Sequence, residues 1–337
     1  MILFIARNAE IVKTNGGAKS LDRHYCRLNP KPMSLDFHFG PLKKDRQFLM
    51  YRYATVRDAD ADFYAAYDAL FLARKSQLLY SIYKHSDSVI SGLAAQDGYF
   101  GCNEEDLHTL LATELHCTAY HQTEALIALI LAEYQNRPDW AYLTSYANSE
   151  IKEAAKAITK RFENIPGTSA SSLKQLVKQG VYANWDLSNT EFATQWGESI
   201  DSIMALLQIV SEQFVDGHEF NSYKHGLRVM LGSAAFGIAQ GELVQENVRT
   251  FAVMSHSMTF LQIEKVGENY GAHMVTKEAK PEYSFKVVQC MGSLLTTIKN
   301  FRLARIQGNL PSEISLPIYD TVHLDQIKPV TKVGVSY

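Results

Sequence analysis

The chain has 337 residues, a formal net charge of −3 at pH 7 and an apolar fraction of 46%, values typical of a globular protein and not of one that coats nucleic acid. Its four cysteines, Cys26, Cys102, Cys117 and Cys290, form no Cys-x-x-Cys pair, so neither a structural zinc site nor a disulfide framework is indicated. The most apolar run, residues 126–132, is far shorter than the ~20 residues of a membrane span. We therefore expect a cytoplasmic protein without membrane contact.

Residues 1–58 show little periodicity. Gly16-Gly17 and the prolines at positions 30, 32 and 41 divide this segment into short pieces, and residues 35–39 alternate between apolar and polar side chains as a strand does. We expect an irregular or β N-terminal segment.

Residues 59–240 carry the spacing of helices, with apolar side chains recurring every three or four positions. The helices predicted here are 59–93, 103–134 with Asn103 as N-cap, 141–163 and 190–214. Residues 164–190, which contain a Ser-rich loop, are interpreted as an insertion between core helices. This part of the chain is expected to be an antiparallel helical bundle.

After residue 240 the pattern becomes partly β. Residues 251–254 and 258–264 are predicted strands, and residues 267–271 are predicted to turn into a third strand at 272–276. A helix from Ser284 to Arg305 follows. The fold class is therefore mainly α, with small β additions near the N- and C-terminal parts, and residues 241–337 are expected to pack on the bundle.

Residues 218–228 hold the densest cluster of nitrogen- and oxygen-bearing side chains. The segment lacks proline and leads into the apolar run 227–231, which favours a helix. On a helix Asn221, His225 and Arg228 would share one face, with Lys224 beside them. Such a face could hold a phosphate or act on one, and the alternative is an ordinary solvated face.

A second polar group occurs on the helix predicted from Asn103. Glu114, Cys117, His121 and Glu124 follow one another at intervals of three, four and three residues, so they form one stripe on an otherwise apolar helix. Such a stripe needs partners, which are either a neighbouring helix or a ligand.

Residues 120–131, in which Gln122 and Glu124 precede an Ala/Leu-rich run, resemble the second helix of HEPN-type four-helix domains. The later segment from Asn221 to His225-Gly226 resembles the signature of the same superfamily, in which Arg and commonly Asn precede a His. The resemblance covers residues 60–240. It implies a homodimer that binds RNA or cleaves it without a metal, in bacterial stress responses or antiviral defence.

By this resemblance His225 is the general acid or base and Asn221 orients the phosphate or the imidazole. Phe220 stands where active members have Arg, so Lys224 or Arg228 would have to supply the cation that the transition state needs. Otherwise the domain binds RNA without cutting it, and the enzymatic assignment stays open. The residues assigned to substrate binding are Glu124, His121 and Tyr223.

Two other classes of function remain. Glu114, His121 and Glu124 on one helix, with His218 and His225 near another, offer the carboxylate and imidazole ligands of an iron site, as in haem-oxygenase-like di-iron oxidoreductases. The other class is a structural or interaction protein in which these side chains satisfy one another.

Overall fold

The computed structural model describes most of the chain from residue 56 onward, and there the predicted mainly helical fold with a small β addition is confirmed. The described residues are 56–94, 103–135, 138–160, 165–188, 190–217, 229–239, 248–266, 269–309, 314, 316–329 and 333–336. The predicted strand at residues 35–39 lies outside them.

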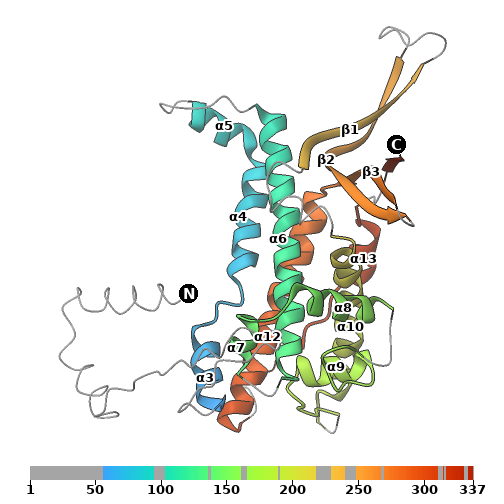
Figure 1. Ribbon diagram of the computed structural model, residues 1–337. Helices are drawn as coiled ribbons and strands as arrows, with labels where there is room; N and C mark the ends of the chain where they lie inside the picture. The colour runs from blue at the N-terminus through green and yellow to red at the C-terminus, as the bar shows by residue number, and fades with distance from the viewer. Residues whose placement is uncertain are drawn as a thin grey trace, which may run out of the picture. The chain divides into compact units, whose positions relative to one another are not determined.

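The elements are named as in Figure 1. The helices are α3 (Val56–Ala66), α4 (Phe71–Lys84), α5 (Ser86–Ala94), α6 (Glu104–Ala132), α7 (Asp139–Leu143), α8 (Asn148–Thr159), α9 (Leu173–Gly180), α10 (Ala193–Val215), α12 (Pro281–Gln307) and α13 (Thr321–Gln326). The strands are β1 (Val229–Ala239), β2 (Val248–Val266), β3 (Asn269–Glu278) and β4 (Val333–Ser336).

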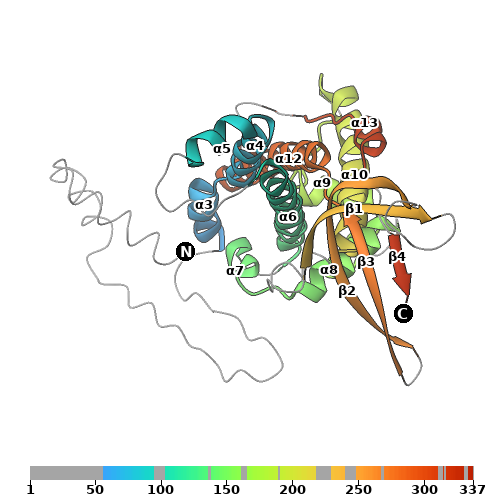
Figure 2. The same cartoon turned by 90° about the horizontal axis from the view of Figure 1, so that it is seen from above.

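Helices α4, α6 and α12 lie side by side at the centre of the bundle (Figures 1 and 2). Lys75 on α4 forms an ion pair with Glu114 on α6 at 3.1 Å. Further along α4, the ring of Tyr83 lies 4.6 Å from that of His108, which comes earlier in α6. Helices α4 and α6 are therefore antiparallel. Helix α10 packs against α6, α8 and α9.

Helices α4 and α12 approach closely because Gly292 lies at their contact. A Cβ atom at this position would lie 2.8 Å from the Cβ of Ala73, which is closer than two carbon atoms can pack. Gln289 donates a hydrogen bond to the carbonyl of Ala73 (2.9 Å), and Lys299 donates one to the carbonyl of Tyr67 (2.6 Å). Helix α12 is therefore antiparallel to α4 and runs in the same direction as α6.

Helix α6 begins where the sequence predicts. The side chain of Asn103 accepts a hydrogen bond from the backbone N–H of Asp106 at 2.8 Å, and the first turn carries three carboxylates, which the helix dipole favours. Its apolar run from Leu126 to Ala132 is buried in the core. Within the described ranges, no helix is both long and apolar enough to cross a bilayer.

Two of the predicted helices are divided in the structure. The helix predicted at 59–93 is three helices, α3, α4 and α5, and the carboxylate of Asp68 ends the first of them by accepting a hydrogen bond from the backbone N–H of Leu70 (3.1 Å). The helix predicted at 141–163 is α7 and α8. Helix α8 starts where Glu150 accepts a hydrogen bond from the backbone N–H of Ala147 at 3.3 Å. Short-range polar contacts override the helical periodicity at both points.

Residues 164–190, predicted as an insertion, contribute to the main core. Leu176 and Val177 of α9 and the following Tyr182 are completely buried there. A Cβ atom on Gly180 would collide with Ile130 of α6, so this glycine lets α9 lie directly against α6. Helix α10 buries the face that the sequence predicts, made of Trp196, Ile200, Ile203, Leu206, Leu207 and Val210.

The strands form one antiparallel sheet in the order β1-β2-β3-β4. The two strands predicted at 251–264 are one long strand, β2. The predicted hairpin exists, but its turn is shorter than expected, because Val266 already pairs with Asn269. The prediction that a helix continues through residues 227–231 is wrong for residues 229–231. These residues belong to strand β1, where Met230 pairs with Thr259 of β2. Pairing with β2 has overridden the local helical pattern.

A buried polar network centred on Arg302 links five helices. Arg302 of α12 is completely buried and donates hydrogen bonds to Asp139 (2.6 Å), to the hydroxyl of Tyr64 (2.5 Å) and to the backbone carbonyls of Leu129 and Gly180 (2.7 and 2.9 Å). This one guanidinium group therefore connects α3, α6, α7, α9 and α12.

Candidate functional site

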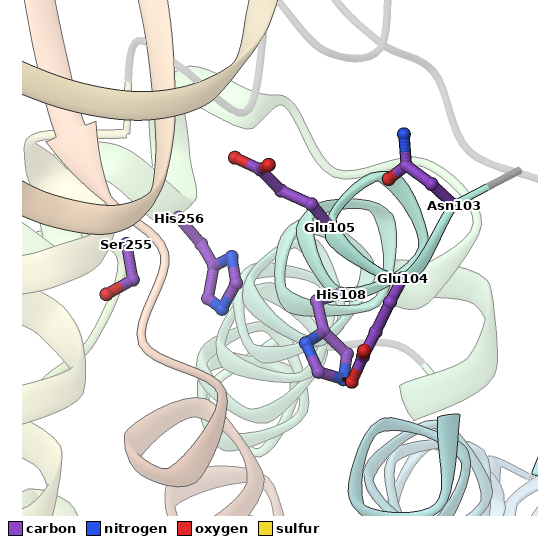
Figure 3. Close-up of a pocket in the computed structure, with 6 residues that line it drawn as sticks. All are labelled: Asn103, Glu104, Glu105, His108, Ser255 and His256. Carbon is purple, nitrogen blue, oxygen red and sulfur yellow. Dashed lines mark ion pairs between the residues drawn. The ribbon is translucent and has the colours of Figure 1, made fainter. Parts of the chain in front are cut away.

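A cleft of 590 Å³ opens between the first turns of α6 and the middle of β2 (Figure 3). Its volume is in the range of small-molecule sites. The residues that line it are Asn103, Glu104, Glu105, His108, Ser255 and His256. Because the N-cap at Asn103 fixes the start of α6, the side chains of the first turns have defined positions relative to the sheet.

His256 joins β2 to two helices. Its Nε2 atom lies 3.1 Å from the hydroxyl of Tyr83 on α4, and its Nδ1 atom lies 3.4 Å from the hydroxyl of Thr109 on α6. Burial, and after it the proximity of His108, lowers the pKa of His256 below its usual value. We therefore expect His256 to be a neutral imidazole at pH 7.

His108 faces His256 across the cleft, with ring centroids 6.1 Å apart and ring planes at 83°. Its Nε2 atom lies 2.8 Å from the hydroxyl oxygen of Ser86 at the start of α5. The Ser86 hydroxyl in turn donates to Glu104 at 3.3 Å. A hydroxyl has a single proton, so when Ser86 donates it to Glu104, His108 donates to Ser86 from Nε2 and its Nδ1 atom is an acceptor.

The cleft thus combines two imidazoles with carboxylates and contains no basic lysine or arginine among its described lining residues. Glu105 and Glu278 both lie close enough to act electrostatically on His256. Such a set can accept hydrogen bonds and attract positive charge.

The sequence did not point to this site. His108 and Glu104 are four residues apart on a helix, which is common on solvated helix faces. His256 is a lone histidine between two serines in a strand, and only the packing of β2 on α4 and α6 brings it next to His108.

The predicted catalytic residues lie outside the described residues. They are His225, Asn221, Lys224 and Arg228; the same holds for Tyr223 and for His218 of the alternative metal site. Their proposed arrangement on one helical face therefore stays a prediction.

The stripe of polar residues on α6 is divided among different neighbours. Glu114 pairs with Lys75 of α4, and Glu124 accepts a hydrogen bond from the hydroxyl of Tyr146 (3.2 Å). Cys117 is buried against Tyr120, whereas the side chain of His121 is exposed. Neighbouring elements thus satisfy much of this stripe.

The iron site predicted from Glu114, His121, Glu124, His218 and His225 can be examined only at its first three residues, because the two other histidines lie outside the described residues. Glu114 and Glu124 are ten residues apart on one helix, which is about 15 Å along its axis and too far to share a metal centre. Among the residues that the structure describes, no group of three or more His, Cys, Asp or Glu side chains could hold a metal ion.

The structure does show where the segment 218–228 begins. Gly217, which follows α10, lies so close to the ring of Tyr120 on α6 that a Cβ atom would be 2.5 Å from it. The hydroxyl of Tyr120 donates a hydrogen bond to the carbonyl of Gln213 (2.9 Å), and Lys277 of β3 forms an ion pair with Asp216 (3.1 Å). The residues before this segment are therefore held against α6 and β3.

Similarity to known proteins gives no independent indication of what either region does. No protein-family model, no curated protein and no solved structure matches the chain.

Proposed function

We propose that the protein acts on RNA as a HEPN-like homodimer, by metal-independent cleavage or by binding alone, in bacterial stress responses or phage defence. The proposal rests on the resemblance of residues 120–131 and 221–226 to the two HEPN sequence motifs. The observation that carries it is the contact of Gly217 with Tyr120, because it brings the chain that leads into the second motif against the helix that bears the first.

Strand β1, which starts at Val229, also contacts α6. His121 and Glu124 follow Tyr120 on α6 within about one turn. The contacts of Gly217 and of β1 with α6 support a composite site built from the two motifs.

In this proposal His225 transfers the proton at the 2′-hydroxyl or at the leaving oxygen, and Asn221 orients the phosphate. Lys224 and Arg228 supply the positive charge that Phe220 cannot provide. Tyr223, His121 and Glu124 contact the RNA. A second protomer would contribute a second copy of the same residues, as a symmetric dimer requires.

The test is RNA cleavage by the full-length protein in excess EDTA, with RNA binding measured in parallel by fluorescence anisotropy. We expect His225→Ala to reduce cleavage by about 100-fold or more, since general acid–base catalysis contributes roughly that factor. His85→Ala, which changes an exposed histidine on the protein surface, is the matched control and should leave the rate unchanged.

If His225→Ala cleaves as fast as the unmodified chain, the catalytic part of the proposal is wrong. In another outcome, the unmodified chain and His225→Ala both bind RNA without cleaving it. If the double substitution Lys224→Ala and Arg228→Ala then abolishes binding, the protein is a HEPN-like RNA-binding protein without cleavage activity. Absence of both activities contradicts an RNA function.

A second candidate function is that of an interaction protein, and one observation favours it. Phe71 and Leu78, seven residues apart on the same face of α4, are 63% and 62% exposed. Leu110 of the antiparallel α6 is 46% exposed. The charged residues beside them are neutralised in pairs, Arg74 with Asp68 and Lys75 with Glu114, so a second copy of this chain would meet no excess of like charge.

Light scattering after size exclusion tests this surface. If a second copy covers it, Phe71→Ser combined with Leu78→Ser should convert a dimer into a monomer. Val322→Ser, at an exposed apolar residue on α13, is the matched control and should not change the oligomeric state. A dimer that survives the double substitution would show that α4 is not its interface.

A further inference from the structure

We propose that the cleft between α6 and β2 binds a small organic cation, a primary ammonium or guanidinium group. The inference concerns residues separate from the segment 218–228 and does not depend on the RNA proposal. It starts from the sign of the charges. Glu104 and Glu105 line the cleft, Glu278 of β3 acts on the same space, and the lining residues that the structure describes include no lysine or arginine.

Two groups at the cleft have unused bonding capacity. In the described part of the chain, the carboxylate of Glu105 makes no hydrogen bond or ion pair, although Figure 3 shows it beside the cleft together with His256. In the tautomer in which Nε2 of His108 donates to Ser86, the Nδ1 atom of His108 is likewise an acceptor without a described partner. An N–H group of a cation could donate to both.

The rings of the site suit the rest of such a ligand. The imidazoles of His108 and His256 stand at 83° to each other, and Tyr83 lies against both of them, with centroids at 4.6 and 5.8 Å. These rings offer flat surfaces for the carbon chain that carries the cation, while the carboxylates offset its charge.

The alternatives fit the geometry less well. A divalent metal ion would need several ligands that converge, but both ring nitrogens of His256 are already engaged, by Tyr83 and Thr109. No set of three metal-binding side chains occurs among the described residues. An anion would be repelled by the carboxylates of Glu104, Glu105 and Glu278.

Protonation provides an internal check on the proposal. The groups that face His256 are Tyr83 from α4, Thr109, Glu105 and His108 from α6, and Glu278 from β3. Burial and the proximity of His108 lower the pKa of His256, so His256 gains a proton only below the usual range for histidine. The positive charge that it then brings into the cleft should weaken the binding of an ammonium or guanidinium group.

The experiment is a titration of the full-length protein with n-butylammonium and with ethylguanidinium, followed by isothermal calorimetry and by the NMR signals of the histidine rings. At pH 7.5 we expect saturable binding with a Kd on the order of millimolar and a shift of the His108 signals. Glu105→Gln should weaken binding about tenfold, which is the value of one charged hydrogen bond. Glu198→Gln, at an exposed carboxylate on α10, should not change it.

Unchanged binding by Glu105→Gln, with thermal unfolding like that of the unmodified protein, would overturn the proposal. Lack of saturation up to about 50 mM ligand would overturn it as well. The same holds if inorganic phosphate or Zn²⁺, titrated alone, binds at this cleft more tightly than either organic cation.

Discussion

Arg302 and Asp139 form a buried ion pair between the end of α12 and the first turn of α7, with Nη1 and Oδ2 2.6 Å apart and side chains 0% and 7% exposed. Glu133, also buried, lies 3.5 Å from the Nε atom of Arg302. The charge is thus compensated on two sides. The Tyr64 hydroxyl accepts a hydrogen bond from Nη1, and two backbone carbonyls accept hydrogen bonds from Nη2. A pair of this kind is destabilising to break, because the remaining partner cannot reach water.

We predict that Arg302→Met lowers the free energy of unfolding by about 3–5 kcal/mol, since it leaves the carboxylate of Asp139 buried without its cation. Urea unfolding followed by circular dichroism measures this. Arg74→Ala is the matched control, because it breaks an exposed arginine–aspartate pair whose partner is Asp68, and it should change stability by less than about 1 kcal/mol. Equal effects of the two substitutions would contradict the structural role given to Arg302.

Asp60 makes the stability of this region dependent on pH. Its carboxylate accepts a hydrogen bond from the backbone N–H of Asp139 (2.7 Å). Burial, and after it the charge of Asp139, raises the pKa of Asp60 to about 7. In the unfolded chain this pKa is about 3.9, so between about pH 4 and pH 7 the folded protein holds a proton that the unfolded chain has released. Stability must then decrease as the pH rises through this range.

Asp60→Asn removes the titrating carboxyl group and keeps an oxygen that can accept the hydrogen bond from the backbone N–H of Asp139. We therefore expect the unmodified protein to lose about 1–3 kcal/mol relative to Asp60→Asn from pH 4 to pH 7, with no further relative loss above pH 7. This expected loss is smaller than the free energy that the whole pKa shift of Asp60 implies, because the carboxyl group is not completely desolvated. Urea unfolding over this pH range measures the difference. Asp62→Asn, at an exposed position of the same helix, should show the profile of the unmodified protein.

Gln122 is a completely buried amide on α6 whose nitrogen and oxygen have no hydrogen-bond partner within the described structure. It lies near Gly292 of α12, in apolar surroundings. Because an unsatisfied buried polar group is unfavourable, we predict that Gln122→Met raises the free energy of unfolding by about 1–3 kcal/mol.

The control for this prediction is Gln289→Met on α12. Gln289 donates hydrogen bonds to the carbonyl of Ala73 and to the hydroxyl of Ser76, both at 2.9 Å, so the same replacement should destabilise there. Thermal unfolding of both variants decides the matter. If Gln122→Met destabilises the protein as much as Gln289→Met, the amide of Gln122 has partners in solution.

Gly217 should tolerate no side chain. In Gly217→Ala the new Cβ would lie 2.5 Å from the Tyr120 ring and 2.9 Å from the carbonyl oxygen of Phe214, so we predict a loss of about 1–3 kcal/mol. Gly197→Ala in the second turn of α10 is the opposite case, since its Cβ would meet nothing within 4 Å. It should gain about 0.5–1 kcal/mol through the helix propensity of alanine. Equal stability of the two variants in urea would show that Gly217 does not contact Tyr120.

Much of the bundle could be predicted because its signals are local. The N-cap at Asn103, the apolar face of α10 and the extent of α12, with Pro281 in its first turn and Gly308 in a left-handed conformation just after its end, depend on residues a few positions apart. Capping and periodicity act over one or two helical turns, so the sequence alone determines where such helices form.

Other features depended on contacts between distant parts of the chain. The start of β1 at residues 229–231 was predicted as a helix, and it is a strand because β2, which comes later in the sequence, supplies its hydrogen bonds. The partners of the polar residues on α6 could not be derived either, since Lys75 and Tyr146 lie on other elements. The spacing of the polar residues on α6 predicted that their side chains need partners, but the packing of the other helices determines which residues these partners are.

The amino-acid sequence by itself determined a helical protein with a β addition and a conspicuous segment at residues 218–228, because composition, caps and periodicity are local properties. Only the tertiary structure joined His108 to His256 and Arg302 to Asp139, because each pair is made by elements from separate parts of the chain. Hydrophobic burial brings such elements together, and a side chain's charge, accessibility and proton affinity then depend on neighbours that its local sequence does not contain.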